Sequence, residues 1–125
     1  LRIRLLRPFP EQALIKYFSG KKALAVIDQN LSMGKGGVLH SEITSVLYGV
    51  SDAPPIVASF IGGLGGRDIS QQEFFQMAEI LRESAKTGDT PKPRLLYTQT
   101  EYREFKKLQA IAVVERHELK KEQST

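Results

Sequence analysis

Two short apolar runs place the strongest constraint on how this chain folds. "ALAVI" (residues 23–27) and "PIVASFI" (residues 55–61) are continuous hydrophobic stretches, typical of strands that are buried on both faces of a parallel sheet. Each run is followed by a glycine-rich segment and then by an amphipathic helical pattern. Such an order produces a parallel sheet with right-handed crossovers and helices on both faces. The sequence therefore predicts an α/β fold with three layers, α/β/α, and a mainly parallel sheet.

Turn and capping residues predict the remaining elements of the first two thirds. "LRIRLL" (residues 1–6) alternates apolar and basic residues, which predicts a strand that is ended by the prolines after it. Helices are expected over residues 11–18 and 38–48, each closed by a glycine. A third helix begins at a capping box of Ser70 and Glu73, continues to about Lys86, and carries the apolar residues Phe74, Phe75, Met77, Ala78 and Leu81.

The chain changes character near Gly88. "TGDTPKPR" is typical of a linker, and "RLLY" predicts a short edge strand. A charged helix is expected from Thr98 to about Lys121, because Thr98 and Glu101 form a second capping-box pattern, although "AIAVVE" within it also fits a strand. We therefore expect a domain over residues 1–88 and a C-terminal extension over residues 89–125.

Composition excludes several classes of function. The 125 residues include no cysteine, which excludes disulfides and iron–sulfur ligation in this segment, and the two histidines are far apart. The net charge of +4 is mild and the basic residues are spread among carboxylates, so no nucleic-acid partner is expected. No run reaches membrane-spanning length and no signal peptide precedes the first strand, which favours a cytoplasmic protein without a membrane partner. Because the chain starts inside a predicted strand, we expect it to be a piece of a longer protein.

Neither glycine-rich loop is a specific motif when it is taken singly. "GKGG" is followed by Val38 in place of the Ser or Thr of a phosphate-binding loop, and "GGLGGRD" does not have the dinucleotide spacing. The simplest interpretation is tight turns without a ligand, in which Gly65 and Gly66 adopt positive φ. Asp28 and Glu42 could act as acid and base, but no nucleophile or metal partner accompanies them. Asp28 is better suited to accept hydrogen bonds from the loop amides that follow it.

Taken together and in order, the stretches resemble a known family. "RPFP", "AVIDQNLSMGKGGVLHSEI", "LYG" and "IGGLGGRDIS" closely resemble the C-terminal domain of the α subunit of pyruvate:ferredoxin oxidoreductase (pyruvate synthase). The resemblance covers roughly residues 1–86 and implies a transketolase C-terminal-domain-like fold. Gln29 departs from the usual Arg of the family pattern. The matching positions are residues 7–10, Asp28, Asn30, Ser32, Gly34, Gly37, Glu42 and residues 63–68.

The resemblance implies a non-catalytic domain within a larger enzyme. In that family, thiamine diphosphate with Mg lies between two other domains, iron–sulfur clusters lie elsewhere, and coenzyme A is the co-substrate. The parent complex would convert pyruvate to acetyl-CoA and reduce ferredoxin; pyruvate is favoured over 2-oxoglutarate because "DQNLSMGKGG" lacks the sequence typical of enzymes for that acid. No catalytic, cofactor-binding or metal residue is expected in this segment. Family members also carry a further strand beside "ALAVI", ahead of residue 1, which is missing here.

The resemblance also assigns the two loops to contacts with other domains and subunits of the oxidoreductase. Arg67 and Asp68 are expected to pair with each other or with a neighbour. The alternative is a free-standing anion- or nucleotide-binding α/β module that uses "GKGG" with Lys35. The expected interface or structural residues are Asp28, Asn30, Ser32, Met33, Gly34, Lys35, Gly37, Glu42, Leu64, Gly65, Gly66, Arg67 and Asp68.

Overall fold

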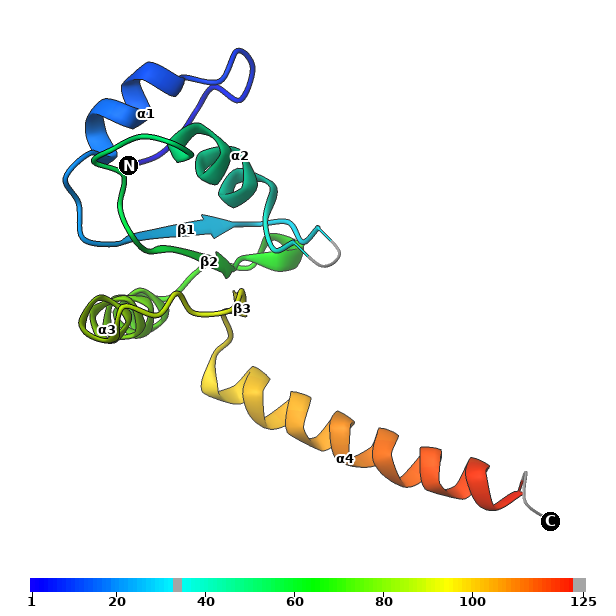
Figure 1. The fold of residues 1–125 in the computed structure, drawn as a ribbon. Helices are drawn as coiled ribbons and strands as arrows, with labels where there is room; N and C mark the ends of the chain where they lie inside the picture. Colours follow the sequence, from blue (N-terminus) through cyan, green and yellow to red (C-terminus); the bar gives the residue numbers. More distant parts are fainter. Residues whose placement is uncertain (33–34, 123–125) are drawn as a thin grey trace.

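The computed structural model describes residues 1–32 and 35–122, and it has three layers. In Figure 1, α1 and α2 lie on one side of a sheet and α3 lies on the other, which confirms the expected α/β/α architecture. The elements in chain order are α1 (Glu11–Phe18), β1 (Leu24–Asp28), α2 (Val38–Leu47), β2 (Val57–Ile61), a short 3-10 turn η1 (Leu64–Gly66), α3 (Gln71–Thr87), β3 (Arg94–Leu95) and α4 (Gln99–Glu122).

The sheet is parallel and has the order β1-β2-β3. β1 and β2 pair in register from Leu24 with Val57 to Asp28 with Ile61. Successive side chains of a strand point to opposite faces, so each strand serves two cores. Val26 of β1 packs against α1 and α2 in a core with Leu14, Phe18, Ile43 and Leu47, whereas the other face carries Ala58, Phe60, Met77 and Leu96.

The N-terminal segment differs from the expectation. Residues 1–6 form no strand, so that prediction is wrong, and Leu1, Leu5 and Leu6 are exposed. Alternation gives a segment a preference for extended backbone, but a strand also needs a neighbouring strand to satisfy its backbone groups. Within the described residues, β1 pairs with β2 alone and no strand lies beside residues 1–6. β1 is therefore an edge strand of this sheet.

The apolar residues of α3 are divided between core and surface. Met77 is buried, but Phe74 and Phe75 are 48% and 62% exposed. Glu73, one residue before this pair, is fully buried instead. The helix therefore presents a charged side chain to the interior at its first turn, and the loop before it must supply a partner.

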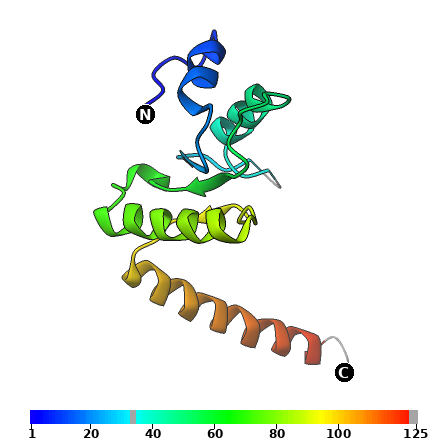
Figure 2. The ribbon, with the colours of Figure 1, turned by 60° about the vertical axis from the view of Figure 1, so that its left-hand side comes forward.

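The short edge strand and the last helix confirm two further predictions. β3 pairs with β2 through Arg94 and Leu95, and the next residue, Leu96, is buried in the core under α3. α4 then leaves the body of the molecule, and both views show it projecting as a single helix (Figures 1 and 2). Its apolar side chains are exposed, including those of Phe105, Leu108 and Ile111.

The loop between β2 and α3 depends on left-handed glycines. Gly65 and Gly66 have φ of +71° and +83°, as expected, and Gly63 shares this conformation. Residues with a Cβ, and β-branched ones above all, are strained in this region of backbone space.

We expect Gly66→Val to lower the free energy of unfolding by more than about 1 kcal/mol, because Val at positive φ is strained. Apart from the adjacent residues, no atom lies within 4 Å of the position that a Cβ would take at Gly66, so backbone strain would cause the loss. Gly66→Asn is the matched control, since Asn adopts left-handed backbone more readily. Urea unfolding of both variants measures the difference, and equal stability of Val and Asn would contradict the prediction.

Candidate functional site

The two glycine-rich loops lie side by side at the carboxyl ends of β1 and β2 (Figure 1). Their bases are joined directly, because the backbone N–H of Gly62 donates to the carbonyl of Asp28 at 2.9 Å. A Cβ on Gly63 would come within 2.9 Å of Nε2 of Gln29, so the loops approach each other closely. Open α/β sheets bind their ligands at this edge, which makes the loops the candidate site.

The first loop closes on the start of α2. Asp28 is 3% exposed, and its carboxylate accepts the backbone N–H groups of Leu39 at 2.8 Å and His40 at 3.1 Å. Oδ1 of Asn30 accepts the N–H of Val38 at 3.0 Å. The first amides of a helix lack partners within the helix and carry its positive dipole end. Here these helix N–H groups donate to the Asp28 carboxylate and to the side-chain oxygen of Asn30.

The other predicted residues of the first loop have structural contacts or face solvent. Ser32 donates its N–H to the carbonyl of Gly36 at 2.7 Å, and Lys35 is exposed. A Cβ on Gly37 would overlap the Asp28 carboxylate, so glycine permits the close approach. Glu42 forms an ion pair with Arg7 at 2.6 Å. Met33 and Gly34, which were also predicted as interface residues, lie outside the described residues.

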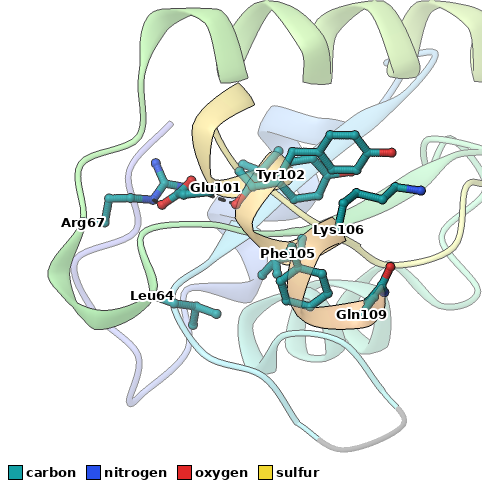
Figure 3. Close-up of a pocket in the computed structure, with 10 residues that line it drawn as sticks. Leu64, Arg67, Glu101, Tyr102, Phe105, Lys106 and Gln109 are labelled. Carbon is teal, nitrogen blue, oxygen red and sulfur yellow. Dashed lines mark hydrogen bonds and ion pairs between the residues drawn. The ribbon is translucent and has the colours of Figure 1, made fainter. Parts of the chain in front are cut away.

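The second loop places Arg67 between two glutamates from different helices. Its Nη1 and Nη2 donate to both carboxylate oxygens of Glu73 at 3.0 and 2.7 Å, and its Nε lies 2.9 Å from Oε1 of Glu101. Nη2 also donates to the carbonyl of Leu96 at 3.1 Å. Figure 3 shows Arg67 and Glu101 joined across the gap between the loop and α4.

The expected ion pair of Arg67 with Asp68 is not formed. Arg67 donates to the backbone carbonyl of Asp68 at 2.8 Å, while the Asp68 side chain is exposed. Adjacent residues in an extended turn point in different directions, so the guanidinium reaches carboxylates that are further along the chain. Leu64, at the start of η1, is 43% exposed beside this network.

Both predicted capping boxes are confirmed, and both supply a partner to Arg67. Ser70 and Glu73 exchange hydrogen bonds at the start of α3, at 2.8 and 3.3 Å. Thr98 and Glu101 do so at the start of α4, at 2.6 and 3.2 Å. Sequence reasoning found the caps but missed that Glu73 and Glu101 share one arginine. The only local signal was a basic residue shortly before a capping box.

The ion pair between Arg67 and Glu73 shifts the pKa of both groups. The Arg67 guanidinium, which hydrogen-bonds to the Glu73 carboxylate, lowers the pKa of Glu73 to about 2, against the opposing effect of burial. The same hydrogen bond raises the pKa of Arg67 above its ordinary value. Both groups are therefore ionised at neutral pH, and removal of Arg67 would leave the buried Glu73 carboxylate as an unpaired charge.

An apolar groove adjoins Arg67. Its volume is about 600 Å³, and Figure 3 shows it between Leu64 of the second loop and the first turns of α4. Tyr97 and Tyr102 stack at its side with 5.2 Å between ring centroids, and Nζ of Lys106 lies 5.5 Å from the centroid of Tyr102. Such a surface can receive apolar side chains.

Within the described residues, no three His, Asp or Glu side chains gather closely enough to hold a metal ion. Over the same residues, no helix combines the length and the apolar character that crossing a bilayer would require.

Comparison with known proteins shows that this chain is similar in sequence to one enzyme family. The family model described as "Pyruvate:ferredoxin oxidoreductase core domain II" matches residues 1–74. The ketoisovalerate oxidoreductase subunit VorA of Pyrococcus furiosus is 33% identical over 96 residues, which are 77% of this chain and 24% of that protein. The pyruvate synthase subunit PorA of Thermotoga maritima is 39% identical over 72 residues, 58% of this chain and 18% of that protein. PorA of Methanosarcina barkeri is 35% identical over 91 residues, which are 72% and 22% of the two chains. The chain therefore spans about a quarter or less of the length of these relatives.

We expect Glu73→Gln to destabilise the chain strongly at neutral pH and much less in acid. Because the pKa of Glu73 is lowered on folding to about 2, its ionisation adds stability above its unfolded pKa, and this stability is lost as the pH falls toward 2. A shift of this size corresponds to roughly 3 kcal/mol, most of it lost by about pH 3.

Urea unfolding of both forms at pH 7 and pH 3 measures this effect. Glu79→Gln is the matched control on the same helix, because Glu79 is exposed and its ion pair is with Arg82, three residues later and also exposed. A Glu73→Gln penalty that does not change with pH would contradict the ionised, paired state of Glu73.

Proposed function

Because the chain belongs to the pyruvate:ferredoxin oxidoreductase core domain II family, we propose that it is a non-catalytic, subunit-joining domain of a thiamine-diphosphate-dependent 2-oxoacid:ferredoxin oxidoreductase. Residues 1–88 would form the domain proper and residues 89–125 its extension. The parent complex would oxidatively decarboxylate its 2-oxoacid to the acyl-CoA and reduce ferredoxin. Thiamine diphosphate, Mg and iron–sulfur clusters would be held by other parts of the complex, and coenzyme A would be the acyl acceptor.

The observation that carries the non-catalytic role is that the acidic groups best placed for chemistry are already committed to contacts within the chain. Asp28 caps α2, Glu42 pairs with Arg7, and Glu73 and Glu101 share Arg67. General acids and bases need to reach a substrate proton, which a carboxylate buried in a cap does not do. The two loops are thus better suited to rigid contact surfaces than to catalysis.

Two relatives' names bear on the substrate. Pyruvate synthase and ketoisovalerate oxidoreductase subunits both align with this chain at similar identity. We propose pyruvate, which would yield acetyl-CoA, as the first candidate for the parent enzyme and a branched-chain 2-oxoacid as the second. Discrimination between them would reside in the domains that bind the reacting carbons.

The occupied amides of α2 count against the free-standing anion-binding alternative. Phosphate sites at helix starts use N–H groups that have no other partner. The N–H groups of Val38, Leu39 and His40 all donate to side chains of the same loop. Lys35 alone would offer a solvated charge, which binds phosphate weakly and without direction.

The exposed parts of the two loops are the proposed contact surface, called here the loop surface: Lys35, Leu64 and Asp68. Leu64 supplies an apolar point between polar neighbours, the usual composition of an interface centre and its rim. Arg67 belongs to the supporting layer beneath this surface, because its guanidinium is already bound within the chain.

We expect the chain alone to bind no thiamine diphosphate and to catalyse no 2-oxoacid oxidation, because the proposal assigns the cofactor to other domains. Calorimetry with thiamine diphosphate and Mg, followed by a viologen-reduction assay with coenzyme A and either pyruvate or ketoisovalerate, measures both. The whole complex is the positive control. Micromolar binding of the cofactor to the isolated chain would contradict the non-catalytic role.

We also expect Leu64→Asp, in the whole complex, to weaken subunit assembly by about 1–2 kcal/mol, roughly five- to thirtyfold in the dissociation constant, because it buries a charge at the interface. Size-exclusion chromatography would show smaller species. Tyr17→Asp is the control, since Tyr17 is also exposed but lies on α1, away from the loops. If assembly holds in Leu64→Asp, while Lys35→Glu abolishes binding of inorganic phosphate, the anion-binding alternative is correct.

A further inference from the structure

Arg67 connects the starts of two helices through the same position of each. Glu73 and Glu101 are the third residues of α3 and α4, and each completes the capping box of its own helix. One oxygen of each carboxylate accepts the N–H of the capping residue, while Arg67 binds both groups. The arginine therefore joins the root of α4 to the start of α3.

The two halves of this contact differ in burial and geometry. The Glu73 side chain is 2% exposed and is held by two guanidinium hydrogen bonds. The Glu101 side chain is 42% exposed and is held through Nε alone. Exposed ion pairs contribute little and are screened by salt, whereas a buried bidentate pair cannot open without leaving an uncompensated charge.

We propose that Arg67 is an asymmetric clamp, permanently bound to Glu73 and releasable at Glu101, that holds α4 in one direction and lets it swing when the outer pair opens. When the Arg67–Glu101 pair opens, Arg67 is still paired with Glu73, so no buried charge loses its partner. The inference concerns only contacts within the chain, and it is therefore independent of the proposed function.

The contacts around the clamp indicate which part of the chain is fixed to the sheet and which part can move. Leu96 is buried, and its N–H donates to the carbonyl of Ile61 at 2.7 Å, so the chain is fixed to the sheet up to this point. Beyond it, the root carries the Tyr97–Tyr102 stack and is joined to the second loop by the Arg67–Glu101 pair. The rest of α4 projects from the body (Figures 1 and 2). The pivot therefore lies between Leu96 and the first turn of α4, and a small rotation there moves the exposed Leu108 and Ile111 through a large arc.

Spin-label distances test the clamp directly. The chain has no cysteine, so Ala85→Cys on α3 and Val113→Cys on α4, both at exposed positions, give one labelled pair in the full chain. Glu101→Gln removes the charge that Arg67 binds but keeps a capping side chain, because Gln also completes a capping box. Glu104→Gln is the matched control, since Glu104 pairs with Lys107 of its own helix.

The expected result is a narrow distance distribution in the parent and in Glu104→Gln, and a broad one in Glu101→Gln. Hydrogen exchange at the first turn of α4 should rise in Glu101→Gln by up to about fivefold, the range expected from loss of an exposed ion pair. The salt dependence gives a second criterion: high salt should broaden the parent and leave Glu101→Gln unchanged. A narrow distribution in Glu101→Gln, a broad one in the parent at low salt, or equal broadening in both variants would each overturn the clamp.

Discussion

The buried carboxylate of Glu73 is the constraint on which the second half of the molecule depends. A charge removed from water in this way must be paired and hydrogen-bonded, and Arg67 meets that need together with Ser70. The loop can deliver Arg67 only because Gly63, Gly65 and Gly66 adopt left-handed backbone. The same guanidinium also binds the carbonyl of Leu96, so the turn, α3 and the chain that follows β3 are ordered by one ion pair.

The first loop also satisfies a buried carboxylate, but with backbone N–H groups instead of an arginine. Asp28 ends β1 in a buried position, and the N-terminal amides of α2 supply its hydrogen bonds. Gly37 has no side chain because the Asp28 carboxylate lies where a Cβ would be. Glycine-rich turns between strand and helix often hold a phosphate, but here each helix start receives a carboxylate of the chain itself. The two loops are self-contained supports, which is why their outward surface, rather than their amides, is available for contacts.

Local patterns in the sequence predicted most of the elements because those patterns act locally. The apolar runs of β1 and β2, the capping boxes at Ser70 and Thr98, and the glycines that follow α1 and α2 each determine their own neighbourhood. The partners of Arg67 could not be predicted in this way, since Glu101 reaches it only after β3 has joined the sheet. The strand predicted over residues 1–6 is absent for a similar reason: a strand forms only beside another strand, and the local pattern does not show whether one is there.

Phe74 is exposed beside the open edge of β1. Phe74 lines an apolar groove of about 470 Å³ along the free side of β1, together with Leu39 and Ile43 of α2 and Leu81 of α3. The groove is bordered by apolar side chains from both helical layers, so a strand placed in it would be buried on both faces. The resemblance to the oxidoreductase family leads us to expect a further strand at this position. Phe74 would then be a core residue, as the apolar pattern of α3 indicated, and its exposure in this chain reflects the open edge of β1 rather than a polar role for that face of the helix.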